Sequence, residues 1–484
     1  MAAHPMTPRW RLQLAPGMAA ELRAHLFPGD GDEHGAVLGV SVVETDRGVR
    51  LLGRRLFLAK DGVDYVAGTR GYRMLTATFV RDRVMDCQRE GLAYLATHCH
   101  RGTDRVAFSD ADLASHERGY PALLDILGDQ PVGALVFARQ AVAGDIWLPG
   151  GHRVTLESAV VGGWPREVLH PAPQPTQPRD LTYDRQSRLF GDRGQAILAA
   201  QKVAVIGAGG AGSLLVEYLA RLGVGHLVVI DPDRIDRTNL PRVVGSRFRD
   251  AHPWLTDPAR AAVLRSLGHR LATPKVRVAR RVARQANPKI RIDAVPDDVT
   301  RDDVVMSLID CDCLFLAADS MQARLVFNAL VHQYLIPGIQ VGAKVQVSQD
   351  GSVTDIFSIV RPVAPGFGCL WCNELINPAK LQEEATSVEQ VRRQRYVDDH
   401  AVEAPSVISL NAVAAAHAVD DYMLSATGLL PSDYEPLWRR FHPAAACTAD
   451  RISYEIPRRG GDCTECGERG RLGIGRRRHM PTKR

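Results

Sequence analysis

Two histidines and two carboxylates within the first 112 residues have the types and order of a catalytic metal site. His98 and His100 end an apolar stretch, and because residues i and i+2 of a strand point to the same side, both imidazoles face one way. Asp112 lies in the first turn of a helix that Ser109 is expected to cap. Two histidines and one carboxylate leave a zinc position open for water, which is a catalytic arrangement. Glu33 supplies a second carboxylate that can act as a general base.

A glycine-rich loop predicts a nucleotide site in the second half of the chain. Residues 207–212 fit the pattern G-x-G-x-x-G between an apolar strand and a helix. Gly207, Gly209 and Gly212 allow a tight turn and a close approach of phosphate to a helix N-terminus. Asp231 ends the next strand, where a carboxylate can bind ribose hydroxyls. By itself this pattern most readily indicates NAD.

The residues after Asp231 favour a triphosphate over NAD. Asn239 and Arg242 lie three residues apart in a polar loop, and Lys275 begins a later helix. Asp319 comes after an apolar strand segment, where a carboxylate can hold Mg²⁺ on phosphates. A nucleophile that attacks the α-phosphate of a nucleoside triphosphate needs cations nearby, because negative charge builds on the phosphates during that step.

Four of the nine cysteines form two CxxC pairs about 90 residues apart. Cys369 with Cys372 and Cys463 with Cys466 supply four thiolates, which suit a tetrahedral structural Zn²⁺. Two pairs of buried reduced thiols are the alternative. The odd number of cysteines and the missing export signal argue against disulfides.

The N-terminal region mixes helices and strands. Hydrophobic spacing predicts helices over 17–26, over 73–90 and from Ser109 onward, and strands over 35–43, 49–58, 92–97, 132–138 and 143–148. We therefore expect an α+β domain over residues 1–160.

The C-terminal region alternates strands and helices. We expect strands over 202–206, 226–230, 290–294 and 313–317, and helices over 212–222, 275–285, 321–334 and 411–424. Such alternation implies a mainly parallel sheet with helices on both faces, so residues 181–467 are expected to form an α/β, Rossmann-like domain. Residues 161–180 are expected to be a proline-rich linker, and 468–484 a disordered basic tail.

Composition narrows the class of protein. The chain has 484 residues, 45% of them hydrophobic and 24% charged, with a net charge of +5. Its last 18 residues carry seven basic residues and one acid, so the rest is nearly neutral and a nucleic-acid partner is not expected. No apolar stretch is long enough for a membrane span and no signal peptide is evident, which predicts a cytoplasmic protein.

From about Leu181 to Gly467 the sequence resembles the ubiquitin-activating superfamily, in particular MoeB/ThiF-type adenylyltransferases. The resemblance rests on Tyr183-Asp184-Arg185-Gln186, the glycine loop, Asp231, Asp233, Asn239 to Arg242, Lys275, Asp319, Arg324 and the two CxxC pairs. It implies that Asp231 binds ribose and that Asn239, Arg242 and Lys275 hold the phosphates of ATP. It also implies that Asp319 serves Mg²⁺ and the nucleotide, and it supports the zinc assignment of the cysteines.

The same resemblance bears on partners. Arg185 would reach the site of a partner protomer, which implies a homodimer.

Thiol-transferring members of the superfamily carry a cysteine before the crossover segment, but residues 402–407 contain none. Cys447 lies beyond the helix expected over 411–424, so we expect it to be a packing cysteine and no thioester to form.

The stretch from about Trp10 to Gly150 resembles the JAMM (JAB/MPN) metalloprotease family, which has Glu, then His-x-His, then Ser-x-x-Asp. The resemblance implies that His98, His100 and Asp112 bind Zn²⁺, that Glu33 is the base and that Ser109 supports the oxyanion.

Together the two resemblances imply an enzyme that uses ATP, Mg²⁺ and two Zn²⁺ ions, one catalytic and one structural. It would adenylate the C-terminal glycine of a small ubiquitin-like or sulfur-carrier protein ending in Gly-Gly, and cut a peptide or isopeptide bond after that glycine. A conjugating enzyme or a sulfurtransferase would be a further partner. The alternatives are an activating enzyme of a sulfur-transfer pathway, an inactive carrier-binding scaffold and an NAD oxidoreductase.

Overall fold

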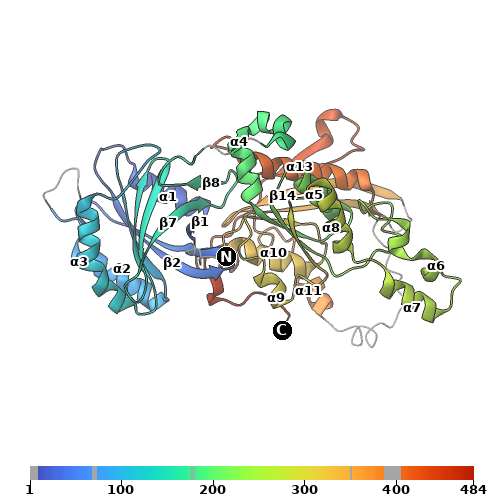
Figure 1. Cartoon of the computed structure of the whole chain (residues 1–484), viewed down its shortest axis with the longest axis horizontal. Coiled ribbons are helices and arrows are strands. Elements are labelled where there is room, and N and C mark those ends of the chain that lie inside the picture. Colours follow the sequence, from blue (N-terminus) through green and yellow to red (C-terminus); the bar gives the residue numbers. More distant parts are fainter. Residues whose placement is uncertain are drawn as a thin grey trace, which may run out of the picture. The chain divides into compact units, whose positions relative to one another are not determined.

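The computed structural model describes residues 9–67, 73–175, 178, 180–348, 352–385 and 405–483. They fall into two compact units: unit 1 lies within 1–176, 332–335 and 466–478, and unit 2 within 177–331, 336–465 and 479–484. Figure 1 shows unit 1 mainly in blue to teal and unit 2 in green to red. None of the helices in the described ranges is long and apolar enough to cross a membrane.

Unit 1 is built on a closed, barrel-like sheet. Its strands run in the order β1-β3-β2-β4-β5-β6-β7-β8, and β1 also pairs with β7, which closes the sheet. The elements are β1 (Trp10–Leu14), α1 (Pro16–Leu26), β2 (Gly35–Thr45), β3 (Gly48–Leu58), α2 (Ala77–Glu90), β4 (Ala93–Cys99), α3 (Asp110–Leu127), β5 (Val132–Ala138), β6 (Ala141–Trp147), β7 (Arg153–Val161), β8 (Glu167–Leu169) and the 3₁₀ turn η4 (Gly475–Arg477). The sequence predicted helices and strands here, but not the closure.

Unit 1 has two hydrophobic cores, one on each face of its sheet, because side chains alternate between the faces along each strand. On β2, Leu38 packs with residues of α1 on one side of the sheet, whereas Val37 packs with residues of α2 and α3 on the other. Successive residues of a strand point to opposite faces, so one strand serves both cores. The site residues at the end of β4 are therefore carried by a strand packed on both sides.

Capping residues fix where α2 and α3 begin. Thr76 accepts the backbone N–H of Phe79 at 3.2 Å, so α2 begins at Ala77 and not at Arg73 as the spacing predicted. Leu75, just before it, pairs with Tyr65 in an isolated β-bridge. Ser109 caps α3 as predicted.

Unit 2 contains a second eight-stranded sheet in the order β11-β10-β9-β12-β13-β14-β15-β16. The pairings from β11 to β13 are parallel and those from β13 to β16 are antiparallel. The strands are β9 (Lys202–Ile206), β10 (His226–Ile230), β11 (Arg291–Val295), β12 (Cys313–Leu316), β13 (Gly338–Val347), β14 (Val353–Val363), β15 (Trp438–Phe441) and β16 (Ile452–Glu455). The parallel part has the strand order of doubly wound sheets, in which ligands bind at the carboxyl edge where that order reverses, here between β9 and β12.

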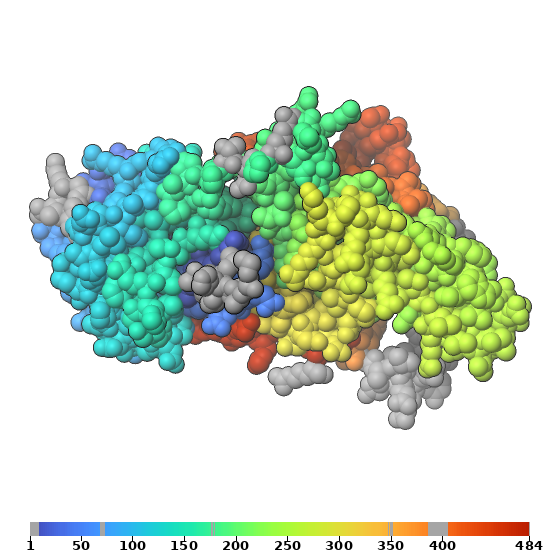
Figure 2. Space-filling model, in the orientation of Figure 1, coloured from blue at the N-terminus to red at the C-terminus, as the bar shows by residue number. Residues whose placement is uncertain are grey.

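Helices cover this sheet. They are α4 (Asp184–Ala200), α5 (Gly210–Arg221), α6 (Pro253–Thr256), α7 (Ala262–Leu271), α8 (Lys275–Ala286), α9 (Asp302–Met306), α10 (Met321–Gln333), α11 (Pro378–Ala385) and α13 (Ile408–Ala426), with 3₁₀ turns η1 (Leu181–Tyr183), η2 (Phe248–Ala251) and η3 (Thr448–Arg451). In Figure 1, α13 and α5 lie above the strands, and α9 and α10 below them. The sequence did not predict α6 and α7, which lie at the surface of unit 2 (Figure 2).

The basic tail differs from the disordered segment expected from its charge. Within unit 1, Arg54 donates hydrogen bonds to the carbonyls of Gly470 and Leu472 at 3.1 and 2.7 Å. Leu472 is only 8% exposed and Met480, in unit 2, only 7%. Apolar residues spaced between the arginines give this segment a buried side, so it is ordered.

Candidate functional site

The end of β4 presents the two predicted histidines of unit 1. His98 pairs in register with Gly35 on β2 and with Val136 on β5, so the backbone there is held on both sides. Cys99, between the two histidines, points the other way: its thiol is buried and donates to the carbonyl of Leu26 at 2.9 Å. The side-chain alternation expected from the sequence is thus present.

Three predicted ligands converge at this point. The Nε2 atoms of His98 and His100 are 3.1 Å apart. The two oxygens of Asp112 lie 3.6 Å from Nε2 of His98 and 3.4 Å from Nε2 of His100. All three ligand atoms lie within 4.8 Å of one another, so one ion can touch all three. Two imidazoles and one carboxylate are a donor set that zinc accepts, with a position left for water.

Neighbouring groups orient these ligands. Nδ1 of His100 lies 3.1 Å from the carbonyl of Ala107, and a hydrogen bond there leaves Nε2 free to bind a metal. Ser109 donates its backbone N–H and its hydroxyl to Oδ2 of Asp112 at 2.8 and 2.7 Å. In this structure Ser109 therefore holds a predicted ligand, whereas the resemblance gave it an oxyanion role.

Glu33 lies beside the three ligands. Its Oε1 is 3.9 Å from Nε2 of His100, and its side chain is 28% exposed. Burial raises the pKa of Glu33. The hydrogen bond with Asp112 raises the pKa of His100, and burial of Asp112 is outweighed by hydrogen bonds from His100, His98 and Ser109, which hold its pKa well below the usual value. Glu33 is thus placed to take a proton from a molecule bound at the three ligands.

The glycine loop of unit 2 packs too tightly for side chains at two of its three predicted positions. Gly207 has φ of +93°, and a Cβ there would lie 2.8 Å from the backbone nitrogen of Ala318. A Cβ on Gly212 would lie 1.8 Å from the carbonyl oxygen of Gly207, whereas one on Gly209 would meet nothing within 4 Å. The first and third glycines thus serve protein packing, and the second leaves open space at the start of α5.

Asp231 anchors the polar side of this loop. It accepts the backbone N–H of Ala208 at 2.7 Å and that of Asp233 at 2.8 Å. Lys275, at the start of α8, lies 2.7 Å from Asp233 and 3.9 Å from Asp231. Burial raises the pKa of Asp231, and the Lys275 charge opposes that shift. Three predicted residues from two loops therefore form one cluster at the carboxyl edge of β10.

The loop after this cluster is a compact turn. Asn239 is 3% exposed, and its backbone N–H donates to Oδ1 of Asp236 at 3.0 Å. The backbone N–H of Arg242 donates to the carbonyl of Asn239 at 3.0 Å. The turn therefore fixes the backbone from which Arg242 projects.

Asp319 lies just beyond β12, on the other side of β9 from the strand that Asp231 follows. It is exposed and lines a pocket of about 450 Å³, a usual size for a small-molecule site. The other charged residues that line this pocket were not predictable, because they come from three separate segments without a local pattern: Asp298, Lys380, Glu384 and Lys483.

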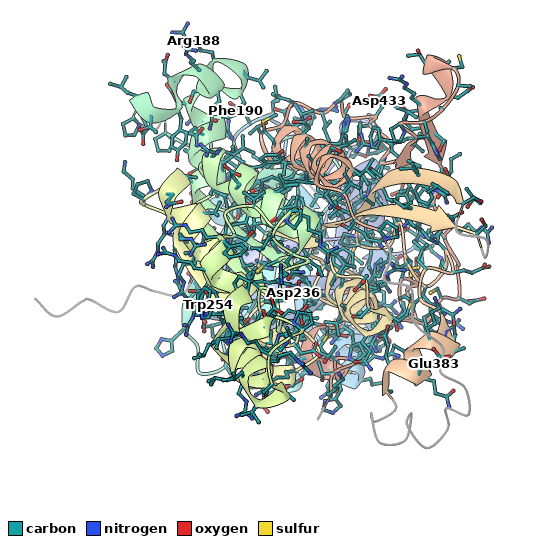
Figure 3. All side chains as sticks on the ribbon, turned by 90° about the vertical axis from the view of Figure 1, so that its right-hand side faces the viewer. Arg188, Phe190, Asp236, Trp254, Glu383 and Asp433 are labelled. Atoms are coloured by element: carbon teal, nitrogen blue, oxygen red, sulfur yellow. The ribbon has the colours of Figure 1, made fainter. Side chains whose placement is uncertain are left out.

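Arg185 is exposed near the start of α4, away from both groups. Its neighbour Gln186 donates to the carbonyl of Leu222 at 2.9 Å, which places this part of α4 at the C-terminal end of α5, opposite the glycine loop. Figure 3 labels Arg188 and Phe190 on the same helix. Arg185 is therefore not part of the nucleotide cluster of its own chain.

The four predicted cysteines lie together. The sulfurs of Cys369, Cys372, Cys463 and Cys466 are all within 4.8 Å of one another. Zn–S bonds of about 2.3 Å in a tetrahedron place sulfurs about 3.8 Å apart, so the cluster fits a zinc ion. The segment 402–407, where no transfer cysteine was found, lies partly outside the described residues, and Cys447 is exposed instead of packed.

Unit 2 thus belongs to the class of α/β proteins with a glycine loop and an acidic cluster at the carboxyl edge of a parallel sheet. More narrowly, residues 183–454 match the ThiF family, and the chain belongs to that family. Residues 9–175 lie outside the match.

Several relatives of known name are similar to part of the chain. The SAMP-activating enzyme E1 of Haloferax volcanii is 29% identical over 209 residues, covering 42% of this chain and 67% of that protein. The molybdopterin-synthase adenylyltransferase of Salmonella typhimurium is 32% identical over 193 residues, covering 39% of this chain and 67% of that protein. The sulfur carrier protein adenylyltransferase of Thermus thermophilus is 30% identical over 148 residues, covering 30% of this chain and 47% of that protein.

A crystal structure of Escherichia coli MccB with ATP is similar over 60% of this chain and 75% of that one, at 18% identity and a TM-score of 0.41. The chain spans about two thirds of the Haloferax relative and less than half of the Thermus relative.

Proposed function

We propose that unit 2 adenylates the C-terminal glycine of a ubiquitin-like or sulfur-carrier protein that ends in Gly-Gly. Membership of the ThiF family carries this proposal, since the named relatives include adenylyltransferases of sulfur carriers. The cluster of Asp231, Asp233 and Lys275 supports it, because it joins a buried carboxylate for ribose to a cation for phosphate at one edge of the sheet.

In this reaction a carboxylate oxygen of the carrier's last glycine attacks the α-phosphorus of ATP, and pyrophosphate leaves. Asn239, Arg242 and Lys275 would hold the phosphates and offset the charge that builds on them. Asp319 would hold Mg²⁺, which adds positive charge at the phosphates. Arg185 would act in the site of the partner protomer of a homodimer.

ATP–pyrophosphate exchange tests this function. Candidate carriers are small proteins that end in Gly-Gly, each compared with a version lacking the last glycine. We expect exchange only with the intact terminus, and a loss of orders of magnitude in Asp319→Ala. Asp433→Ala changes an exposed acid outside the proposed site and should exchange normally. Undiminished exchange in Asp319→Ala would exclude the Mg²⁺ role.

The choice between conjugation and sulfur transfer depends on the step after adenylation. No cysteine occupies residues 402–407, and sulfur transfer needs activation without a thioester to this chain. The sulfur-carrier relatives favour the same interpretation. We therefore keep a sulfur-transfer pathway as the second candidate for unit 2.

For unit 1 we propose a zinc-dependent peptidase of the JAMM type that cuts the bond after the carrier's terminal glycine. The convergence of His98, His100 and Asp112, with Glu33 beside them, carries this proposal. Zinc bound to these three residues would act as a Lewis acid and lower the pKa of a water molecule. Glu33 would accept the proton of that water and pass it to the leaving amine, while Ser109 holds Asp112 in place.

A carrier extended by a short peptide beyond Gly-Gly is the test substrate for unit 1. Glu33→Gln should keep its zinc but lose cleavage, whereas Asp112→Ala should lose both. Glu21→Gln, on the exposed side of α1, is the matched control and should cleave normally. Cleavage at the wild-type rate by Glu33→Gln would rule out this mechanism.

A further inference from the structure

The pocket beside Asp319 contains more charge than the predicted nucleotide residues account for. Nine residues line it: Asp298, Thr300, Asp319, Ser320, Met321, Gln322, Lys380, Glu384 and Lys483. They come from the loop after β11, the start of α10, α11 and the segment 479–483. All of them belong to unit 2.

The pocket lies next to the glycine loop. The backbone of Ala317 and Ala318, directly before Asp319, lies so close to Gly207 that a Cβ there would be 2.8–3.0 Å away. Ala317 also donates its backbone N–H to the carbonyl of Ile206 at the end of β9, at 2.8 Å. Asp319, which lines the pocket, therefore follows directly on the segment that contacts the glycine loop, at the carboxyl edge where a doubly wound sheet binds its ligand.

Three of the five charged side chains that line the pocket already have partners. The ammonium of Lys483 lies 3.3 Å from the carboxylate of Asp298. The backbone of Lys483 holds it there, because its N–H donates to the carbonyl of Thr300 at 2.7 Å. The carboxylate of Glu384 accepts the backbone N–H groups of Met321 and Gln322 at 2.8 and 2.9 Å, which offsets its charge at the start of α10.

Lys380 and Asp319 remain. Both side chains are exposed, and within the described ranges neither side chain makes a hydrogen bond or an ion pair, although the guanidinium of Arg324 interacts electrostatically with Asp319. An ammonium and a carboxylate without an ion-pair partner that line one pocket are complementary to a phosphate that carries a divalent cation. The carboxylate suits the cation and the ammonium suits a phosphate oxygen.

We propose that Lys380 binds a phosphate oxygen of the nucleotide in this pocket, so that α11 is part of the adenylation site. Figure 3 labels Glu383 on this helix. Lys380 would add to the cations supplied by Arg242 and Lys275 on the other side of the glycine loop. The inference rests on the proposed function of unit 2, because it requires that the unit binds ATP.

Titration of the full chain with Mg·ATP in the absence of a carrier tests the inference. Lys380→Ala should raise the Kd for ATP about tenfold, as expected for one charged contact at a partly exposed site. Lys380→Arg should keep most of the affinity. Lys289→Ala, which removes an exposed lysine on the turn between α8 and β11, should bind as the wild type does.

Two further readouts separate phosphate binding from a structural effect. The Kd for ATP should rise less steeply with salt in Lys380→Ala than in the wild type, since one screened contact is gone. The Kd for adenosine, which has no phosphate, should be unchanged. Equal weakening of adenosine and ATP, or an equally weak Lys380→Arg, would overturn the inference.

The two proposals fail in different ways. A wild-type chain that does not bind ATP would overturn both the adenylation function and the role of Lys380. A wild-type chain that binds ATP, with a Lys380→Ala variant of equal Kd, would overturn the role of Lys380 alone.

Discussion

A methyl group added at Gly212 should displace the glycine loop. The new Cβ would lie 1.8 Å from the carbonyl oxygen of Gly207 and 2.8 Å from its carbonyl carbon. Carbon and oxygen that are not bonded rest at about 3.5 Å, so the two backbone segments must separate by about 1.7 Å. Because both are backbone, no side-chain rotation can relieve the contact.

Two opposing contributions to the free energy of unfolding determine how strongly Gly212→Ala destabilises unit 2. Overpacking costs about 1–3 kcal/mol, and the rigidity of a backbone contact puts this case at the upper end. Alanine gains up to about 1 kcal/mol over glycine inside a helix, and Gly212 lies in α5. The net loss is therefore about 2 kcal/mol, which corresponds to a fall in Tm of about 3 °C for a unit as large as unit 2.

Thermal unfolding and ATP titration of Gly212→Ala measure this effect, and Gly209→Ala is the matched control. A Cβ on Gly209 meets no protein atom within 4 Å, so the Tm of this variant should stay within about 1 °C of the wild type. Gly212→Ala should have a lower Tm, and its affinity for ATP should fall at least tenfold. Gly209→Ala should lose only ATP affinity, because its methyl group points into the space left for phosphate.

Wild-type Tm and wild-type ATP affinity in Gly212→Ala would refute the reasoning. An equal fall of Tm in both variants would also contradict it, because the structure distinguishes the two positions by packing alone.

The remaining predictions concern the metals, the cysteines and the sharing of sites across a dimer. Metal analysis should find about two zinc ions per chain; Cys463→Ser should lose one of them and lower the Tm of unit 2, whereas Cys447→Ser should change neither. His98→Ala should lose the other zinc with nearly unchanged stability, and a wild type with a single zinc would eliminate one of the two sites. No reducible carrier adduct should form on this chain, and an adduct that disappears in Cys447→Ser would show that a thioester does form. Arg185→Ala should impair exchange, and a mixture with Asp319→Ala should recover part of it only if sites are shared across a dimer.

Local patterns predicted the elements that carry the sites. The apolar runs Lys202–Ile206 and His226–Ile230 are bounded by polar or glycine residues, and the structure gives β9 and β10 the same bounds. The spacing of His98 and His100 and the cap at Ser109 also predicted a group of three candidate ligands, and the structure brings the three side chains together. Hydrophobic periodicity and helix capping depend on residues that are close together in the chain, so both can be recognised from the sequence alone.

Contacts between distant segments were not predictable in this way. Closure of the first sheet joins β1 to β7, for example Leu12 to Ala159, and nothing in either segment specifies the other. The charges around Asp319 come from segments as far apart as Asp298 and Lys483. The tail was expected to be disordered from its charge alone, but Leu472 is buried. In each case the missing information is tertiary packing, which a local pattern does not contain.

The mass of the carrier after incubation with Mg·ATP and this chain tests the central claim most directly. We predict a carrier whose mass has increased by that of an adenylyl group, located on its C-terminal glycine, and pyrophosphate in equal amount. The species should be missing with Asp319→Ala and with a carrier lacking its last glycine. Release of pyrophosphate with no adenylyl group on the carrier, or an adenylyl group elsewhere on it, would contradict the account.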